Sequence, residues 1–274
     1  MPDARADTEL LLDAVREAGE IARARIGTPL DVREKGALGP VTDVDIQIDE
    51  VLRRQLTRAR PDYGWLSEET EDDKARLKAG RVFILDPIDG TRAFIAGEPG
   101  WAVSLAIIDQ GRPVAAAVNL PARGEIYCAT SGAGAFRDGE RITVSRRENL
   151  DGATVLTARK QMEPENWPGG LPPLDRHFRP SLAWRMCLVA AGRFDTMLTF
   201  RPAWEWDIAA GALIAAEAGA LVTDGKGGDL LFNSPEARQP GLIVAPRALH
   251  AGIMAHRLAP GVTPGTASRP EGAK

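Results

Sequence analysis

The sequence has few of the residues that build disulfide frameworks or histidine-based metal sites. It contains two cysteines, Cys128 and Cys187, and three histidines in 274 residues. The cysteines lie far apart and show no metal-type spacing, so we expect both to be reduced thiols, as is usual in the cytoplasm. None of the histidines, His177, His250 and His256, lies near a motif. The sequence therefore argues against a disulfide-rich secreted domain and against a thiolate or imidazole metal site.

Long hydrophobic runs are also missing. No apolar run approaches the roughly 18 residues that would indicate a membrane span. The first twenty residues carry acidic side chains throughout and lack the basic start and apolar stretch of a secretory signal. We therefore expect a cytoplasmic protein without a membrane partner.

A strong positive charge is the third missing feature. The chain has 34 Lys and Arg against 38 Asp and Glu, a formal net charge of −4, and its pI is about 5.6. A general nucleic-acid-binding surface needs a basic field, so we expect no nucleic-acid partner. An acidic protein can still act on an anionic substrate when metal cations mediate the contact.

The chain is long enough for one large domain or two modest ones, with 44% hydrophobic residues. Apolar spacing predicts helices and strands in alternation. In the first half we expect helices at 9–26 and 45–60, and strands at 81–85, 102–108, 114–119, 125–129 and 141–144. In the second half we expect helices at 183–191, 207–218 and 248–257, and strands at 154–157, 196–200, 221–223 and 242–245. The predicted class is α+β in two lobes, 1–150 and 151–258, followed by a tail over 259–274 whose Pro, Gly and Thr content predicts disorder.

One acidic loop directly follows a predicted buried strand. It runs Asp86-Pro87-Ile88-Asp89-Gly90-Thr91. Two carboxylates suit a cation, and the free N–H groups of a helix beginning at Thr91 suit a phosphate. A lone segment of this kind is about as well explained as an acidic turn that caps a helix. The spacing does not fit an EF-hand loop, and acids three apart do not favour a phospho-aspartate mechanism.

Three further acidic positions have structural as well as functional interpretations. Glu68 follows Leu66-Ser67, where a solvated acidic turn is the commoner explanation. Asp45 begins a predicted helix, where an acid favours the helix dipole by a few tenths of a kcal/mol. Asp207 begins another helix beside Trp204 and Trp206. A role as the N-cap of that helix would be enough to explain it. Two tryptophans there would provide a dry wall that strengthens charge interactions.

Taken together, these motifs resemble the inositol monophosphatase superfamily over roughly residues 8 to 255. The matching segments are Pro40-Val41-Thr42 with Asp45, Ser67-Glu68-Glu69, the 86–91 loop, and Trp206-Asp207 with Ala209-Ala210-Gly211, followed by Glu217-Ala218-Gly219. The resemblance implies a layered α/β/α/β/α fold and Mg²⁺-dependent hydrolysis of a small phosphate ester. Lithium inhibition and a homodimer are also features to expect from the resemblance.

The resemblance also implies roles for particular residues. Metal ligands would be the side chains of Glu68, Asp86, Asp89 and Asp207 and the backbone carbonyl of Ile88. Asp45 and Thr91 would orient and activate the attacking water, and the backbone N–H groups of Gly90 and Thr91 would hold the phosphate. Glu68, Asp89, Asp207 and Arg185 are further candidates for substrate binding. Hard carboxylate oxygens suit magnesium, and clustered cations neutralise the charge that makes phosphate esters resist attack.

The substrate remains open between two classes. Inositol-specific relatives carry a Glu seven residues before the last aspartate, where this chain has Phe200. Phe200, the Ser67-Glu68-Glu69 turn and Arg185 look more like the bacterial 3'(2'),5'-bisphosphate nucleotidases, which favours adenosine 3',5'-bisphosphate over inositol 1-phosphate. Arg185 is at least as well explained as a helix-surface arginine. A regulatory binding protein on the same fold is a third hypothesis, although every expected metal position is filled.

Overall fold

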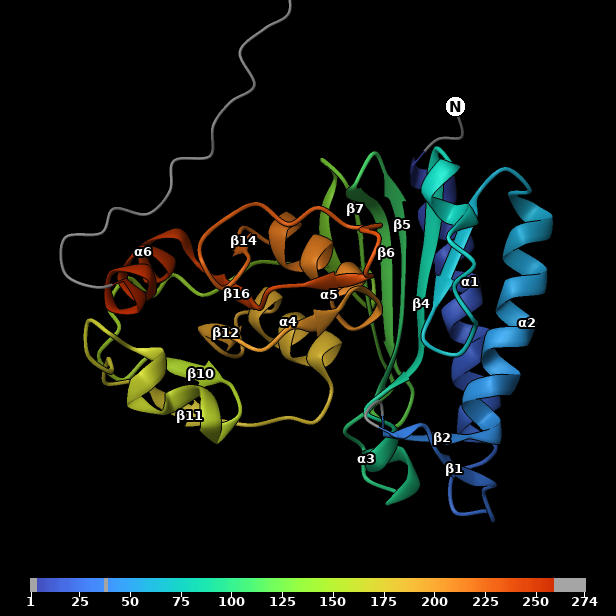
Figure 1. The fold of residues 1–274 in the computed structure, drawn as a ribbon, viewed down its shortest axis with the longest axis horizontal. Helices are drawn as coiled ribbons and strands as arrows, with labels where there is room; N and C mark the ends of the chain where they lie inside the picture. The colour runs from blue at the N-terminus through green and yellow to red at the C-terminus, as the bar shows by residue number, and fades with distance from the viewer. Residues whose placement is uncertain (1–3, 37–38, 259–274) are drawn as a thin grey trace, which may run out of the picture.

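The computed structural model describes residues 4–36 and 39–258, so the predicted disordered tail, 259–274, lies outside the described residues. Figure 1 shows helices and sheets in alternating layers across the long axis. Among the described residues, no helix combines the length and apolar character needed to cross a membrane. The layers confirm the expected α/β/α/β/α arrangement.

A seven-stranded sheet forms the first β layer, in the order β3-β4-β5-β6-β7-β8-β9. β3 and β4 are parallel, and every other pair is antiparallel. The strands are β3 (Gly64–Ser67), β4 (Arg81–Asp89), β5 (Ala102–Asp109), β6 (Arg112–Leu120), β7 (Glu125–Thr130), β8 (Gly134–Arg137) and β9 (Glu140–Ile142). The strand predicted at 141–144 is therefore shorter and shifted, while β3 and β8 had no clear sequence signal.

The hairpin between β5 and β6 depends on its turn residues. Gln110 and Gly111 both adopt positive φ, 47° and 78°. Two consecutive residues of this kind make the tight turn whose twist matches that of paired strands. The glycine predicted to mark this turn is thus explained by backbone conformation.

Two long helices cover one face of this sheet. They are α1 (Ala4–Arg23) and α2 (Asp43–Ala59), and Figure 1 shows them side by side against β4 to β6. Phe83 and Leu85 of β4 belong to the hydrophobic cluster shared with α1 and α2, whereas Val82 and Ile84 belong to the cluster on the opposite face. This alternation is the two-residue period of a strand buried on both faces. α1 ends three residues before the predicted end because residues 24–26 form a turn.

A middle layer of two helices separates the sheets. α4 (Leu182–Ala190) and α5 (Glu205–Glu217) pack on the seven-stranded sheet from the other face, and α4 also contacts the second sheet. α5 begins two residues earlier than predicted and is followed by Gly219 at φ 101°. A helix buried on all sides explains why its sequence is so rich in alanine.

The second sheet has the order β11-β10-β12-β16-β14. Its outer face is covered by α6 (Arg247–Arg257), which packs with Val155, Leu198 and Ile243. The strands are β10 (Thr154–Leu156), β11 (Asp175–His177), β12 (Thr196–Thr199), β14 (Leu221–Thr223) and β16 (Leu242–Ala245). Smaller elements are the ribbons β1 (Val32–Glu34) with β2 (Pro40–Thr42) and β13 (Ala203–Trp204) with β15 (Arg238–Gln239), the helix α3 (Thr91–Ile95), and the 3-10 turns η2 (Ala75–Lys78), η3 (Arg159–Met162) and η4 (Pro164–Asn166).

The lobe boundary at residue 150 stays a prediction. One hydrophobic cluster combines Leu66 and Val82 with Met186 and Val244, which lie on opposite sides of that boundary in the sequence. The middle helices are thus packed between both sheets.

Candidate metal-dependent active site

The predicted acidic loop lies at the end of β4. The strand runs further than expected, and its pairing with β5 shifts between Asp86 and Asp89. Gly90 follows with φ 102°, and a Cβ placed there would lie 3.0 Å from the carbonyl oxygen of Gly100. This position therefore requires glycine, after which α3 begins at Thr91. Both aspartates are buried.

Asp207 approaches this loop from the start of α5. Ser104 in β5 donates a hydrogen bond to the carbonyl of Trp206, 3.2 Å away, which fixes the helix end against the sheet. One carboxylate oxygen from each of Asp86, Asp89 and Asp207 lies within 4.8 Å of the others. The N-cap of α5 is Trp204, so capping does not account for Asp207. The indoles of Trp204 and Trp206 stack with ring centroids 4.6 Å apart, while the water-excluding wall expected of them beside Asp207 stays a prediction.

Asp45 serves its helix and also presents a free oxygen. Its Oδ2 accepts hydrogen bonds from the backbone N–H and hydroxyl of Thr42, at 2.9 and 2.5 Å, which completes a capping box. Its Oδ1 has no hydrogen-bond partner although Asp45 is 1% exposed. Burial raises the pKa of Asp45 to about 6. A buried, unpaired carboxylate oxygen fits a cation or a reacting water.

Glu68 and Glu69 come directly after β3 rather than in a solvated turn. Glu69 is nearly covered, and burial raises its pKa to about 7. Lys35, in the loop after β1, binds both carboxylates, with Nζ to Oε1 distances of 3.0 Å and 2.7 Å. The sequence offered no signal for Lys35, which stands alone in a glycine-rich segment.

Ser181 is the second contact that the sequence analysis missed. Its hydroxyl and the backbone N–H of Ala183 donate to Oδ2 of Asp89, at 2.6 and 2.7 Å. Ser181 is also the N-cap of α4. A serine before an apolar run is a readable capping signal, but its carboxylate partner lies 92 residues away.

Burial dominates the electrostatics of this cluster. It raises the pKa values of Asp86 and Asp207 well above the ordinary value and that of Asp89 to about 6, and the neighbouring carboxylates raise them further. Charges on Glu68, Asp89, Asp207 and Asp45 all act on Asp86. Glu68 and Asp45 therefore lie close enough to the three clustered aspartates to act on the charge of Asp86.

Thr91 and Ile88 lie at the same site. The Thr91 hydroxyl donates to the carbonyl of Ile88 at 3.1 Å, and the Ile88 N–H donates to Oδ1 of Asp86 at 3.0 Å. Within the described residues, no hydrogen bond joins Thr91 to Asp45. The water-activating role of this pair stays a prediction.

Arg185 is buried, although a surface location on its helix explained the sequence equally well. It is 6% exposed, and it donates to the carbonyls of Arg179 and Pro180, at 2.6 and 3.4 Å. Burial lowers its pKa to about 10, while the charge of Asp89 acts in the opposite direction. Arg185 therefore lies close enough to the carboxylate cluster to influence its charge.

Phe200 makes its contacts elsewhere. Its ring packs edge-on against Trp167, with centroids 5.5 Å apart, and the guanidinium carbon of Arg257 lies 3.7 Å from the centroid of the Phe200 ring. These contacts give the residue a packing role beside the second sheet.

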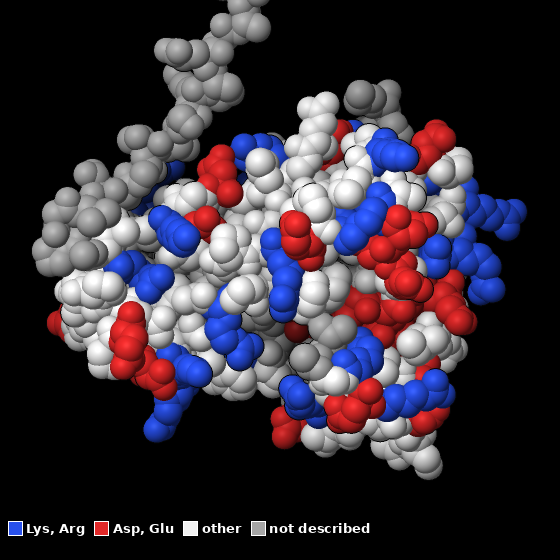
Figure 2. Space-filling view, viewed as in Figure 1, with Lys and Arg blue, Asp and Glu red and all other residues white. Residues whose placement is uncertain are grey.

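Figure 2 shows acidic side chains gathered on the viewed face, over the region between β4 and α2.

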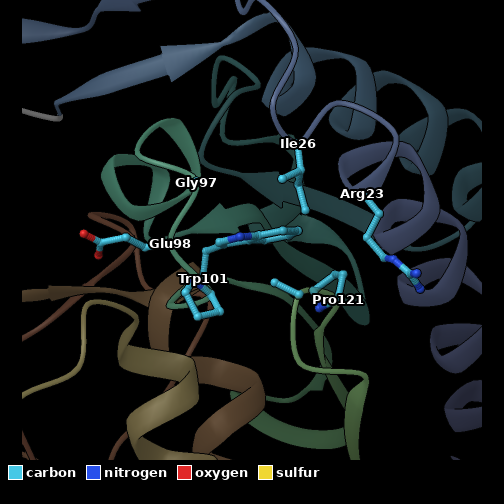
Figure 3. A pocket seen from close by; sticks show the side chains of 8 residues that line it. Arg23, Ile26, Gly97, Glu98, Trp101 and Pro121 are labelled. Carbon is cyan, nitrogen blue, oxygen red and sulfur yellow. The ribbon is translucent and has the colours of Figure 1, made fainter.

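A separate pocket of about 340 Å³ contains none of the predicted site residues. In Figure 3 the indole of Trp101 lies across it between Ile26 and Pro121. Its lining is completed by Arg23, Gly97, Glu98, Pro99 and Ala122.

Comparisons with known proteins identify the family of this chain. The model of the inositol monophosphatase family matches residues 3–259. The chain belongs to the inositol monophosphatase family. An inositol-1-monophosphatase of Rhizobium meliloti is 36% identical over 80% of this chain and 85% of its own length. A Nus factor SuhB of Xylella fastidiosa is 32% identical, covering 80% of this chain and 82% of its own length.

A solved structure shows the same fold in this family. The extragenic suppressor protein suhB of Bartonella henselae superposes with a TM-score of 0.78 at 29% identity, covering 94% of this chain and all of that one. Enzymes of the inositol monophosphatase family are metal-dependent phosphatases, and this chain has the acidic cluster that such chemistry needs. The orphaned Oδ1 of Asp45 and the close carboxylates of Asp86, Asp89 and Asp207 are hard donors that fit a divalent cation.

Proposed function

We propose that this protein hydrolyses a small phosphate monoester by direct attack of water, with Mg²⁺ as its cofactor. The convergence of Asp86, Asp89 and Asp207 within 4.8 Å carries this proposal. Buried carboxylates this close repel one another, so a bound divalent cation would relieve the repulsion. Glu68 and the carbonyl of Ile88 complete the proposed ligand set.

The residues of the chain have distinct proposed roles in this reaction. Bound magnesium would supply charge neutralisation and a lowered pKa for water. Asp45 would accept a proton from that water through Oδ1, since its Oδ2 is held by Thr42. The hydroxyl of Thr91 would orient the same water, and the N–H groups of Gly90 and Thr91 would bind the phosphate. Ser181 keeps Asp89 in place.

Inositol 1-phosphate is the substrate we propose first. The nucleotidase hypothesis depended on three features, and two of them have structural explanations. Phe200 packs against Trp167, and the Ser67 hydroxyl accepts a hydrogen bond from Glu69 N, 3.4 Å away. The Rhizobium meliloti relative carries the name inositol-1-monophosphatase.

Adenosine 3',5'-bisphosphate stays the second candidate because of Arg185. Its buried guanidinium acts on the charge of Asp89, and Arg201 acts on Arg185. A buried guanidinium beside Asp89, with Arg201 close enough to act on it, would suit a second phosphate on the substrate.

A kinetic panel tests both substrates. We would measure kcat/KM with Mg²⁺ for inositol 1-phosphate, adenosine 3',5'-bisphosphate, fructose 1,6-bisphosphate and histidinol phosphate. We expect a preference for inositol 1-phosphate. A preference for the bisphosphate nucleotide that disappears in Arg185→Gln would support the second candidate, and no Mg²⁺-dependent phosphate release from any ester would overturn the proposed activity.

A regulatory role is a third hypothesis, suggested by the Nus factor name of one relative. Asp89→Asn separates it from catalysis, and we expect this variant to lose about 100-fold or more in kcat, since even outer partners of a metal site cost 10–100-fold. Complementation of a deletion strain by a variant shown to be inactive would favour the binding role. We further propose that the protein is cytoplasmic, and the homodimer implied by the family stays a prediction.

A further inference from the structure

Arg76 is a buried arginine that lies outside the predicted site. It belongs to η2, in the segment that follows Glu68 and Glu69, and its side chain is fully covered. The guanidinium binds Asp72 through two nitrogens, at 3.0 and 2.7 Å. It also donates to Oδ1 of Asn233 at 2.6 Å and to the carbonyl of Ser234 at 3.0 Å. Arg76 thus joins two segments more than 150 residues apart in the sequence.

The far segment is held in turn by the first residue of α5. The carboxylate of Glu205 accepts hydrogen bonds from the backbone N–H of Asn233 at 2.6 Å and that of Ser234 at 3.1 Å. The amide of Gln239 donates to it at 2.9 Å. Glu205 is fully buried, and only one residue separates it from Asp207. The 233–234 segment is therefore fixed to the helix turn that carries Asp207.

The near segment is fixed to the strand that precedes Glu68. A Cβ on Gly64, the first residue of β3, would lie 2.9 Å from Cα of Arg76, so the two backbones touch. β3 ends at Ser67, directly before Glu68. Lys74 adds a second tie, because its ammonium group donates to the carbonyl of Pro235 at 2.7 Å.

We propose that Arg76 is a positioning residue that sets the separation between Glu68 and Asp207. Arg76 bonds to Asn233 and Ser234, and the backbone N–H groups of the same two residues bond to Glu205. With the Arg76–Asp72 ion pair, these bonds form one continuous link between the elements that carry the two carboxylates. The link fixes both ends of the ligand set without touching substrate or cation. It rests on the proposed function, in which Glu68 and Asp207 hold the same metal site.

The first test is Mg²⁺ binding by calorimetry with the full-length chain. Arg76→Met removes the guanidinium group but keeps the aliphatic part of the side chain. Asp72→Asn is a milder change, which removes the charge of the carboxylate that pairs with Arg76 but keeps its shape. We expect both variants to bind Mg²⁺ 10- to 100-fold more weakly than the wild type, the range seen when outer partners of metal sites are removed.

The second test needs no metal. The stacked indoles of Trp204 and Trp206 flank Glu205, so their near-ultraviolet circular dichroism reports on the first turn of α5. We expect Arg76→Met to change this signal in EDTA. The spectrum of Trp204→Phe shows which part of the circular dichroism signal comes from the stacked indoles.

Two control variants separate positioning from stability. Arg112→Met removes an exposed pair with Asp229 that also joins the first sheet to the segment after α5. Arg81→Met breaks the ion pairs with Asp7 and Asp109 at the other end of β4. We expect Arg81→Met to lower Tm, and both controls to keep the Mg²⁺ affinity and the tryptophan signal.

The outcomes are distinguishable. If the wild type binds no Mg²⁺, the proposed function fails. If the wild type binds Mg²⁺, and Arg76→Met and Asp72→Asn bind it equally well with an unchanged tryptophan signal, the positioning role is overturned while the proposed function stands.

Discussion

At the scale of single residues, Asp45 combines a structural and a chemical role. One oxygen closes the capping box of α2, and the other lies buried without a partner. The helix thus fixes the orientation of the carboxylate. A structural explanation of an acidic residue and a functional one are therefore compatible at this position.

His250 allows a prediction about pH. Its Nε2 lies 2.7 Å from the hydroxyl of Thr223, and burial lowers its pKa from 6.5 to about 4. The unfolded chain therefore takes up this proton first as the pH falls. The stability due to neutral His250 is complete above about pH 6.5 and is lost as the pH falls towards 4, by an amount on the order of 3 kcal/mol.

Urea unfolding at pH 7 and pH 4.5 checks this sign. We expect His250→Gln to lose less free energy of unfolding between the two pH values than the wild type. His256→Gln, at a partly exposed histidine of the same helix, should behave like the wild type. An equal loss in His250→Gln and the wild type would contradict the assignment.

At the scale of elements, the start of α2 should affect both stability and activity. Thr42→Ala removes the hydroxyl that caps Val44 N and Asp45 N and that donates to Asp45. We expect a loss of about 0.5–2 kcal/mol in the free energy of unfolding, together with a lower kcat because Asp45 is less well oriented. Thr42→Ser should preserve both, and unchanged kcat in Thr42→Ala would count against the role of Asp45.

The contact between α4 and α5 depends on Gly211. A Cβ at this position would lie 2.5 Å from Cε and 2.8 Å from Cβ of Met186. Alanine gains about 1 kcal/mol in helix propensity, yet overpacking of a core typically costs about 1–3 kcal/mol. We expect Gly211→Ala to lower the free energy of unfolding in chemical denaturation. If crowding is the cause, combining it with Met186→Ala should cost less than the sum of the two single changes.

At the scale of the whole molecule, the five predicted site carboxylates are enough to account for the formal net charge of −4. Without Asp45, Glu68, Asp86, Asp89 and Asp207, the remaining 33 acidic residues nearly balance the 34 Lys and Arg. Lys35 is the cation that directly pairs with Glu68 within the described residues. We therefore expect the site to bind phosphate weakly until divalent cations offset its carboxylates.

Chelation should expose this dependence. We expect Mg²⁺ at a hundred times its Kd to raise the free energy of unfolding by about 2.7 kcal/mol, and EDTA to abolish binding of a phosphate analogue. Calorimetric Tm and analogue titrations with and without Mg²⁺ measure both effects. Asp86→Asn should show neither the stabilisation by Mg²⁺ nor the binding of the analogue. Analogue binding of equal strength in EDTA would contradict the expectation that divalent cations are needed for phosphate binding.

Much of the fold was predictable because its signals are local. Periodic apolar residues located the long helices, and the runs around Arg81–Leu85 and Ala102–Ile108 located central strands. The four-residue strands β3 and β8 escaped because each begins with glycine and has only two apolar residues, whereas the similarly short β14 and β16 are richer in Leu, Ile and Val. Most helix ends lie within two residues of the predicted ones, and the largest difference is at the start of α1, which begins at Ala4 rather than at residue 9.

The sequence by itself determined the order of the elements and the identity of the acidic residues, because capping, periodicity and motif spacing are properties of neighbouring residues. Tertiary structure decided which of those acids meet. It also decided that Ser181 holds Asp89, that Arg185 is buried and that Phe200 packs away from the site. The bond between Ser181 and Asp89 joins residues 92 positions apart, and only the packing of the sheets around α4 and α5 brings such residues together.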